Sequence, residues 1–167
     1  MRRAGWLLPL LLCCAHARAG SGRLADEAAI ARVLADWHDA AARADEDRYF
    51  SHFAPGGVFL GTDATERWDA AAFRAFAHPY FAKGKAWTLV PSDRHLEVDG
   101  DHAWFDEALA TSYGPCRGTG VLQRLGGAWK IAQYNLTLTI PNDRVRAVQD
   151  LLAGRAPPPP PGAAAPR

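Results

Sequence analysis

The sequence contains little cysteine. Of its three cysteines, Cys13 and Cys14 lie in an apolar run near the N-terminus and only Cys116 lies further along the chain. If the N-terminal run is removed, no internal disulfide can form, and side-chain packing must stabilise the fold. Cys116 stands alone beside Arg117, and a lone cysteine of this kind is typical of core packing.

Several common chemical motifs are missing. None of the six histidines falls in a metal-binding pattern such as His-Glu-x-x-His. Gly118-x-Gly120 lacks the third glycine and the following helix of a dinucleotide-binding turn, and no Gly-x-Ser-x-Gly motif occurs. We therefore expect neither a metal site nor a cofactor.

The sequence also lacks a strong charge of either sign. It has 19 basic and 18 acidic residues, and removing Arg2, Arg3 and Arg18 leaves 16 basic residues and a net charge of −2. This balance provides no basic surface for nucleic acid or for anionic lipid. We expect neither of them as a partner.

The N-terminus has the pattern of a secretory signal peptide over residues 1–19. Arg2 and Arg3 precede an apolar run from Trp6 to Ala15, and Ala17-Arg18-Ala19 provides the small residues that signal peptidase accepts. The run is shorter than the roughly 20 residues of a membrane span, so we expect no stable membrane insertion. A lipoprotein anchor at Cys13 or Cys14 is the alternative, but it needs a small residue before the cysteine. The pattern predicts an exported protein, either periplasmic or secreted.

One domain is predicted over residues 20–154, followed by a disordered tail over residues 155–167. The tail contains five consecutive prolines, 157–161, and then mainly alanine and glycine. Such a segment cannot form a packed core. The domain shows no internal repeat and no linker, and it is long enough for a core of its own.

The first half of the domain is predicted to be mainly helical. One apolar stripe with helical spacing is formed by Ile30, Val33, Leu34, Trp37 and Ala41. Asp45 can cap a short helix carrying Tyr49, Phe50 and Phe53, which Pro55-Gly56-Gly57 ends before a strand over 58–60. Asp69 can cap a third helix that stops near Gly84, with a kink or an early end at Pro79.

The second half is predicted to consist of strands over 87–98, 103–112, 116–125 and 129–139. Asp99-Gly100 and Gly126-Gly127 are hairpin turn sequences, because glycine accepts the positive φ that such turns require. Consecutive hairpins give an antiparallel sheet with one face covered by helices. A last helix should follow Pro141 and end at Gly154. The order of elements predicts an α+β fold.

Five segments of the sequence resemble a known family. They are 47–50 (DRYF), 61–68 (GTDATERW), 100–107 (GDHAWFDE), 116–122 (CRGTGVL) and 129–136 (WKIAQYNL). Together with the order of elements, they resemble SnoaL-like proteins of the nuclear-transport-factor-2-like superfamily, which includes polyketide cyclases and ketosteroid isomerase. The resemblance runs from about Ala25 to Asn142. It implies a cone-shaped fold, in which a curved antiparallel sheet wraps around the N-terminal helices and leaves a pocket at the wide end.

Strand alternation then suggests which polar residues face this pocket. The resemblance implies that the face of the last strand carrying Trp129, Ile131, Gln133 and Asn135 points inward, with Gln133 and Asn135 binding a ligand. On the preceding strand, Arg117 could bind an anionic or carbonyl group. Alternatively, Arg117 only neutralises Glu107 across the strands.

The adjacent carboxylates Asp106 and Glu107 must point to opposite faces of a regular strand. Ala103 and Phe105 read as core residues, which places Glu107 inside and Asp106 outside. Glu107 is therefore the candidate catalytic residue, a carboxylate that would shuttle protons in an apolar pocket. The alternative is a structural salt bridge from Glu107 to Arg117 or Arg94.

Aromatic side chains complete the predicted pocket. Trp37, Tyr49, Phe53 and Trp68 should line it, with Trp68 as a cap in a loop whose other residues, among them a solvated Glu66–Arg67 pair, are structural. Two functions remain open at this point. The first is binding of a small, largely apolar molecule, with or without an acid–base step such as isomerisation, dehydration or cyclisation; the second is a non-catalytic assembly domain. Trp104 and Tyr134 are predicted on the outer face of the sheet, and they favour a homodimer through that face.

Overall fold

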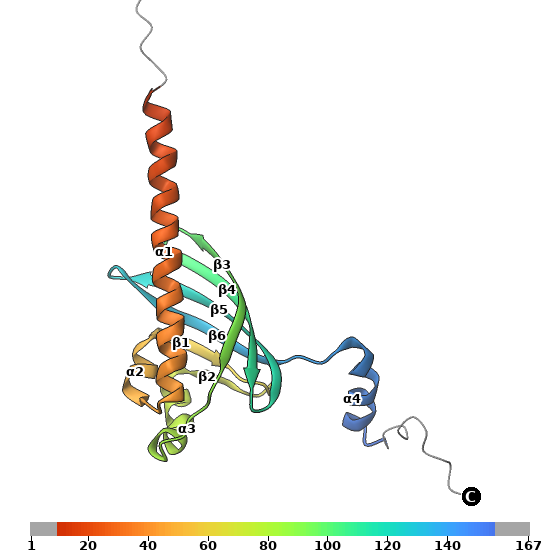
Figure 1. The fold of residues 1–167 in the computed structure, drawn as a ribbon. Coiled ribbons are helices and arrows are strands. Elements are labelled where there is room, and N and C mark those ends of the chain that lie inside the picture. Colours follow the sequence, from red (N-terminus) through yellow and green to blue (C-terminus); the bar gives the residue numbers. More distant parts are fainter. Residues whose placement is uncertain (1–9, 156–167) are drawn as a thin grey trace, which may run out of the picture.

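We describe the protein from a computed structural model, which covers the backbone of residues 10–155 and the side chains from residue 22 onward. The elements, in chain order, are α1 (Leu10–Ala42), α2 (Glu46–Ser51), β1 (Phe53–Leu60), β2 (Arg67–Asp69), α3 (Ala70–Ala82), β3 (Val90–Asp99), β4 (His102–Thr111), β5 (Gly114–Leu125), β6 (Ala128–Leu138), η1 (Asn142–Arg144) and α4 (Val145–Leu152). The helices come mainly before a curved, open sheet, so the α+β cone predicted from the sequence is confirmed (Figure 1). In this described part, no helix has the length and apolar character needed to cross a membrane.

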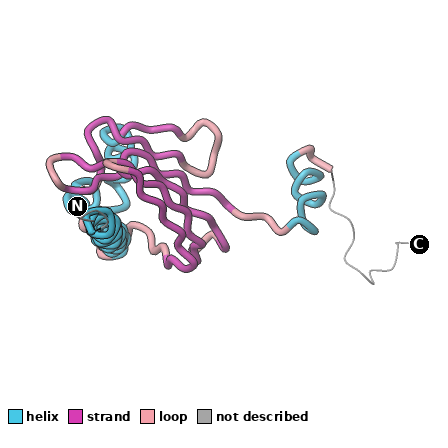
Figure 2. The backbone as a smooth tube through the Cα atoms, turned by 90° about the horizontal axis from the view of Figure 1, so that it is seen from above, coloured by secondary structure: helices cyan, strands magenta, loops and turns pink. Residues whose placement is uncertain are grey.

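Helix α1 lies against the concave face of the sheet, and its apolar stripe is buried (Figures 1 and 2). Ile30, Leu34 and Trp37 are completely inaccessible to solvent. Further toward the N-terminus, Arg23 forms an ion pair with Glu97 of β3 at 2.7 Å. The stripe predicted from the sequence therefore forms the centre of the core.

Both predicted helix caps are present. The side chain of Asp45 accepts a hydrogen bond from the Arg48 amide at 3.2 Å, and that of Asp69 accepts one from the Ala72 amide at 2.8 Å. Helix α2 ends at Ser51. Phe53 was expected in this helix, but it belongs to β1. Helix α3 stops next to Gly84 as predicted, and of the kink or early end expected at Pro79 the early end is wrong. The helix continues to Ala82, because the proline removes only one backbone bond near its C-terminal end.

The sheet has the strand order β2-β1-β6-β5-β4-β3. Strands β3 to β6 are antiparallel neighbours, as the hairpin turns predict. Strand β1 pairs with β6 in parallel, however, so the sheet is mixed where an antiparallel sheet was expected. This arrangement places β6 in the interior of the sheet, between β1 and β5.

Two bulges change which side chains face the concave side. The first bulge is in β6. Two neighbouring residues of β5, Leu122 and Val121, pair with Ile131 and Gln133 of β6, so Ala132 is an extra residue in β6. In β3, Asp93 has a φ of 47° and the register shifts between Ser92 and His95. A bulge of this kind can re-aim a neighbouring side chain.

The bulge at Ala132 makes three predicted orientations wrong. Beyond it, Tyr134 points inward and is completely buried, although strand alternation placed it on the outer face. Gln133 is exposed and Asn135 shares its outward-facing side, where its amide donates to the Thr137 hydroxyl at 3.2 Å. One extra residue reverses the alternation for the rest of the strand.

The C-terminal helix predicted after Pro141 is present as η1 and α4, and it projects away from the sheet (Figure 2). Of the predicted tail, residues 156–167 lie outside the described residues. Residues 1–9 of the predicted signal peptide also lie outside them, and the backbone is helical from Leu10. The boundaries of both segments therefore stay predictions.

Candidate functional site

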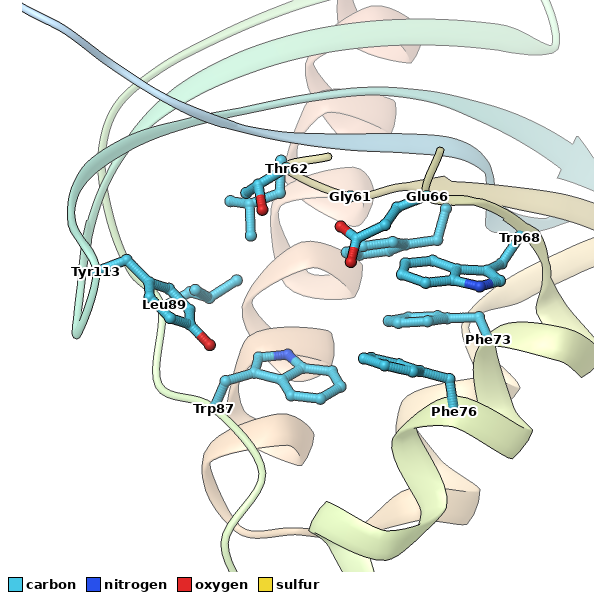
Figure 3. A pocket seen from close by; sticks show the side chains of 11 residues that line it. Gly61, Thr62, Glu66, Trp68, Phe73, Phe76, Trp87, Leu89 and Tyr113 are labelled. Atoms are coloured by element: carbon cyan, nitrogen blue, oxygen red, sulfur yellow. The ribbon is translucent and has the colours of Figure 1, made fainter. Parts of the chain in front are cut away.

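A cavity of about 140 Å³ opens between α3, the β1–β2 loop and the β4–β5 turn (Figure 3). It is lined by Phe59, Gly61, Thr62, Glu66, Trp68, Phe73, Phe76, Trp87, Leu89, Tyr113 and Leu136. Six of these residues are aromatic. A buried apolar cavity of about 150 Å³ accommodates one benzene molecule, so this space matches a single ring.

Stacked aromatic rings form one wall of the cavity. The ring centroids of Phe59 and Phe73 are 3.9 Å apart, and those of Trp68 and Phe76 are 4.8 Å apart with nearly parallel planes. Figure 3 shows Trp68, Phe73 and Phe76 one above the other, with Trp87 below the opening. Phe73 and Phe76 are three residues apart in α3, so both project from the same side of the helix.

The loop between β1 and β2 places a carboxylate at this cavity. The Asp63 side chain accepts hydrogen bonds from the Thr65 amide at 2.8 Å and the Thr65 hydroxyl at 2.6 Å, and these bonds lower the pKa of Asp63. The Glu66 carboxylate folds back over Gly61 and accepts from the Asp63 amide at 3.1 Å. A Cβ atom at residue 61 would overlap with Oε2 of Glu66, so a larger residue there would displace this carboxylate from its position over Gly61.

Glu66 carries the only carboxylate among the described residues that line the cavity, and no Lys, Arg or His side chain of that part of the chain lines it. Its side chain forms no ion pair with the residues whose side chains are described. Thr62 adds a hydroxyl on the same side (Figure 3). The cavity therefore combines an aromatic wall with one acidic, hydrogen-bond-accepting end.

A second group of functional side chains is buried deeper in the cone. Nε2 of His38 lies 2.8 Å from Oε1 of Glu107, and Arg94 contacts Oε2 of the same carboxylate through Nε at 2.7 Å and Nη2 at 2.6 Å. Glu107 is completely buried and His38 is 5% exposed. The bulge at Asp93 lies in β3 directly opposite Glu107 and turns Arg94 inward to meet it.

The Tyr134 hydroxyl is a polar atom in the same interior and has no hydrogen-bond partner in the described part of the chain. Burial raises the pKa of Tyr134, and the charge of Glu107 raises it further. Burial likewise raises the pKa of Tyr49. Both phenols are thus neutral over the ordinary range of pH.

The buried cluster does not reach the cavity. None of His38, Arg94 and Glu107 lines it. Tyr134 packs on Phe59 with ring centroids 5.7 Å apart, and Phe59 forms part of the cavity wall. Arg94 and His38 each contact one oxygen of Glu107, so neither carboxylate oxygen is without a partner.

The predicted site residues fall into four groups. Trp68 lines the cavity, and Trp37 and Tyr49 are core residues that do not. Glu107 points inward as strand alternation predicts, and its chemical role stays a prediction. The inward orientation expected for Arg117 is wrong, as it is for Gln133 and Asn135. Arg117 is exposed on the outer side of β5, and Arg94 pairs with Glu107 in its place.

Sequence reasoning missed Glu66, Trp87, Tyr113 and His38. No local pattern marks Trp87 or Tyr113, because they reach the cavity from loops that only the folded sheet brings together. His38 did carry a signal, since it lies four residues after Leu34 and three before Ala41 on the buried side of α1. Among the side chains described, those of residues 22–155, no group of three or more His, Cys, Asp or Glu is arranged to hold a metal ion.

Comparison with known proteins identifies the family. The model of the SnoaL-like domain matches residues 30–141, which is more than half of the chain. No curated protein matches the sequence significantly. Solved structures do match, and these similarities, all at low sequence identity, show the fold.

A protein of unknown function from Pseudomonas putida, described as NTF2-like, is 15% identical over 72% of this chain and 91% of its own, with a TM-score of 0.62. An NTF2-like protein with a cystatin-like fold from Novosphingobium aromaticivorans is 16% identical over 86% of this chain and 98% of its own, with a TM-score of 0.61. A protein from Streptomyces avermitilis, provisionally called a dehydratase of the NTF2-like family, is 14% identical over 70% of this chain and 98% of its own, with a TM-score of 0.59. With its family match and its cone of helices and curved sheet, the chain belongs to the SnoaL-like family and has the nuclear-transport-factor-2-like fold.

Proposed function

We propose that the protein binds a small molecule built on one largely apolar ring, and that the ring occupies the cavity beside Trp68, Phe73 and Phe76. The observation that carries this proposal is the cavity itself, which has about the volume of one ring and is walled by aromatic side chains. Trp37, Tyr49 and Phe53 pack as core residues, which is the arrangement that favours a non-catalytic assembly domain, whereas the open space beside Trp68 favours binding.

The acidic end of the cavity limits the ligand further. An ionised carboxylate only accepts hydrogen bonds, so Glu66 suits a hydroxyl or amino group on the ring. A carboxylate at this end of the ligand would meet Glu66, and no basic side chain of the described chain lines the cavity to compensate. We therefore propose a ring with a hydrogen-bond donor, such as a phenol, at the Glu66 end.

An acid–base step of the isomerase, dehydratase or cyclase type is the second candidate function. Glu66 supports it, because this carboxylate lies within the cavity and could exchange a proton with a bound ligand. The buried pair of His38 and Glu107 is the other group with suitable chemistry. It would act on a ligand only if the wall at Phe59 opened.

Calorimetric titration with 4-ethylphenol tests the binding function. We expect saturable binding, with the dissociation constant raised about tenfold or more in Trp68→Ala, since this change removes a large part of the ring contact. Trp104→Phe, on the outer face of β4, is the control and should bind like the parent. Absence of saturable binding of both 4-ethylphenol and indole by the folded protein would overturn the proposal.

A further inference from the structure

A second cavity adjoins the first. It has a volume of about 500 Å³ and is lined by Ala42, Phe76, Tyr80, Gly84, Lys85, Ala86, Trp87, Thr88, Ser112 and Tyr113. Phe76, Trp87 and Tyr113 line both spaces, which we call the inner cavity (about 140 Å³) and the outer cavity (about 500 Å³). Figure 3 shows these three side chains around the inner cavity on the side away from Glu66 and Thr62.

The two cavities differ in charge. Lys85 is the charged residue of the outer cavity, where Thr88 and Ser112 add hydroxyl groups, and no Asp or Glu of the described chain lines this space. Lys85 forms no ion pair among the described side chains. The inner cavity has the opposite character, with the carboxylate of Glu66. The combined space is therefore acidic at its inner end and basic at its outer end.

The backbone after α3 fixes the position of Lys85. Gly84 has a φ of +68° and its amide donates to the Phe81 carbonyl at 2.9 Å, which closes the last turn of the helix. The chain then passes directly from Lys85 to Trp87, the residue shared by both cavities. Lys85 thus lines the outer cavity two residues before a side chain that also lines the ring-binding space.

We propose that the outer cavity binds a carboxylate carried on a short chain by the same ligand whose ring occupies the inner cavity. Lys85 pairs with this carboxylate, and the hydroxyls of Thr88 and Ser112 donate hydrogen bonds to it. The ligand class is then a hydroxyaryl alkanoate, with its hydroxyl at Glu66 and its carboxylate at Lys85. This inference rests on the proposed function, because it requires the ring to bind in the inner cavity.

Three compounds with the same ring and the same two-carbon chain test this inference. They are 4-ethylphenol, which ends in a methyl group, 3-(4-hydroxyphenyl)propanoate, which ends in a carboxylate, and tyramine, which ends in an ammonium group. We expect calorimetry to give a dissociation constant for the propanoate about threefold lower than for 4-ethylphenol, and a higher one for tyramine. The gain is modest because Lys85 is exposed to water.

Charge reversal at Lys85 provides the decisive comparison. In Lys85→Glu, tyramine should bind more tightly than the propanoate. Lys83→Glu makes the same change of net charge two residues away, at a side chain that lines neither cavity. In this variant the propanoate should still bind more tightly than tyramine. Preservation of the order in Lys85→Glu, or its inversion in both variants, would overturn the inference, since long-range charge alone explains the second result.

The outcomes also separate this inference from the proposed function. If 4-ethylphenol binds but the three compounds bind equally, the inner cavity retains its function and the carboxylate subsite is rejected. If neither these three compounds nor indole binds to the folded protein, both proposals are rejected. Indifference of the propanoate affinity to Lys85→Gln would likewise reject the subsite alone.

Discussion

Nε2 of His38 on α1 lies 2.8 Å from Oε1 of Glu107 on β4, and neither side chain is appreciably exposed to solvent. Arg94 of β3 occupies the other carboxylate oxygen. This group joins the central helix to two strands of the sheet. Buried charges are tolerated only when each is paired, so the three side chains depend on one another.

Glu107→Gln should lower the free energy of unfolding by about 3 kcal/mol, because it leaves the guanidinium of Arg94 without its counter-charge in the interior. Asp106→Asn changes the neighbouring carboxylate, which faces the other side of β4 and forms no ion pair with the side chains that the structure describes. It should change the free energy of unfolding by less than about 0.5 kcal/mol. Urea denaturation of both variants measures the difference, and equal midpoints would contradict the structural role of Glu107.

Gly120→Ala should destabilise the protein by about 3 kcal/mol. A Cβ atom at residue 120 would lie 2.6 Å from Cε1 of Phe105 and 2.8 Å from the backbone oxygen of Gln133. The backbone oxygen cannot move without disturbing the pairing of β5 with β6. Thr119→Ala, the adjacent residue on the other side of the strand, is the control for thermal unfolding, and an equal loss in both variants would refute the predicted steric conflict.

The pH dependence of stability should include a contribution from His52. Burial lowers the pKa of His52, as do the charges of Lys130 and Arg48, while the carboxylate of Asp36, 2.7 Å from Nε2, opposes the change. The imidazole of His52 therefore binds a proton more readily in the unfolded chain than in the folded protein. The contribution of His52 to stability is greatest above the unfolded pKa of about 6.5 and falls as the pH drops below it.

The variant His52→Gln removes this proton site. We therefore expect the free energy of unfolding of the parent to decrease more between pH 7 and pH 5 than that of His52→Gln. Denaturation curves at the two pH values give both decreases. A parent that loses no more stability than the variant would show that the imidazole is not depressed in the folded state.

The outer face of the sheet remains a predicted dimer interface. Trp104 is half-exposed there, and tryptophan is often a dominant residue of protein interfaces. We expect the parent to sediment as a dimer at micromolar concentration and Trp104→Arg to sediment as a monomer. A monomeric parent would contradict the prediction, which no longer includes Tyr134.

Export also remains a proposal, with cleavage after Ala19. Expressed from its own start in a bacterial host, the protein should appear in the periplasm or medium with a mass that begins at Gly20. Ala19→Leu should prevent processing, because signal peptidase accepts only small residues at this position, whereas Ala15→Leu should not. Mass spectrometry distinguishes the two forms. Exported protein that retains residues 1–19 would disprove cleavage.

The sequence was sufficient to predict those features that depend on residues close together in the chain. The stripe through Leu34 and Trp37 and the caps at Asp45 and Asp69 follow from helical spacing and side-chain hydrogen bonding, and all are present. The inward position of Glu107 followed from strict strand alternation, since β4 is regular around it.

Alternation failed where a strand contains an extra residue. Nothing in the sequence around Ala132 marks a bulge, and the strand pairs there with β1 on one side and with β5 on the other. Glu66 was read as a solvated partner of Arg67, but the loop folds its carboxylate over Gly61 and into the cavity. These features depend on contacts between segments far apart in the chain.

The bulge at Ala132 has an evolutionary consequence. While it persists, residues 133 and 135 face outward and can be exchanged for other polar residues at little cost, whereas Tyr134 cannot. A descendant that lost Ala132 would keep these orientations, because Ile131, Gln133 and Tyr134 would then alternate inward, outward and inward along a regular strand. The extra residue can therefore be lost without compensating substitutions at either position, so the length of this strand is expected to vary between lineages while its pattern of residues is kept.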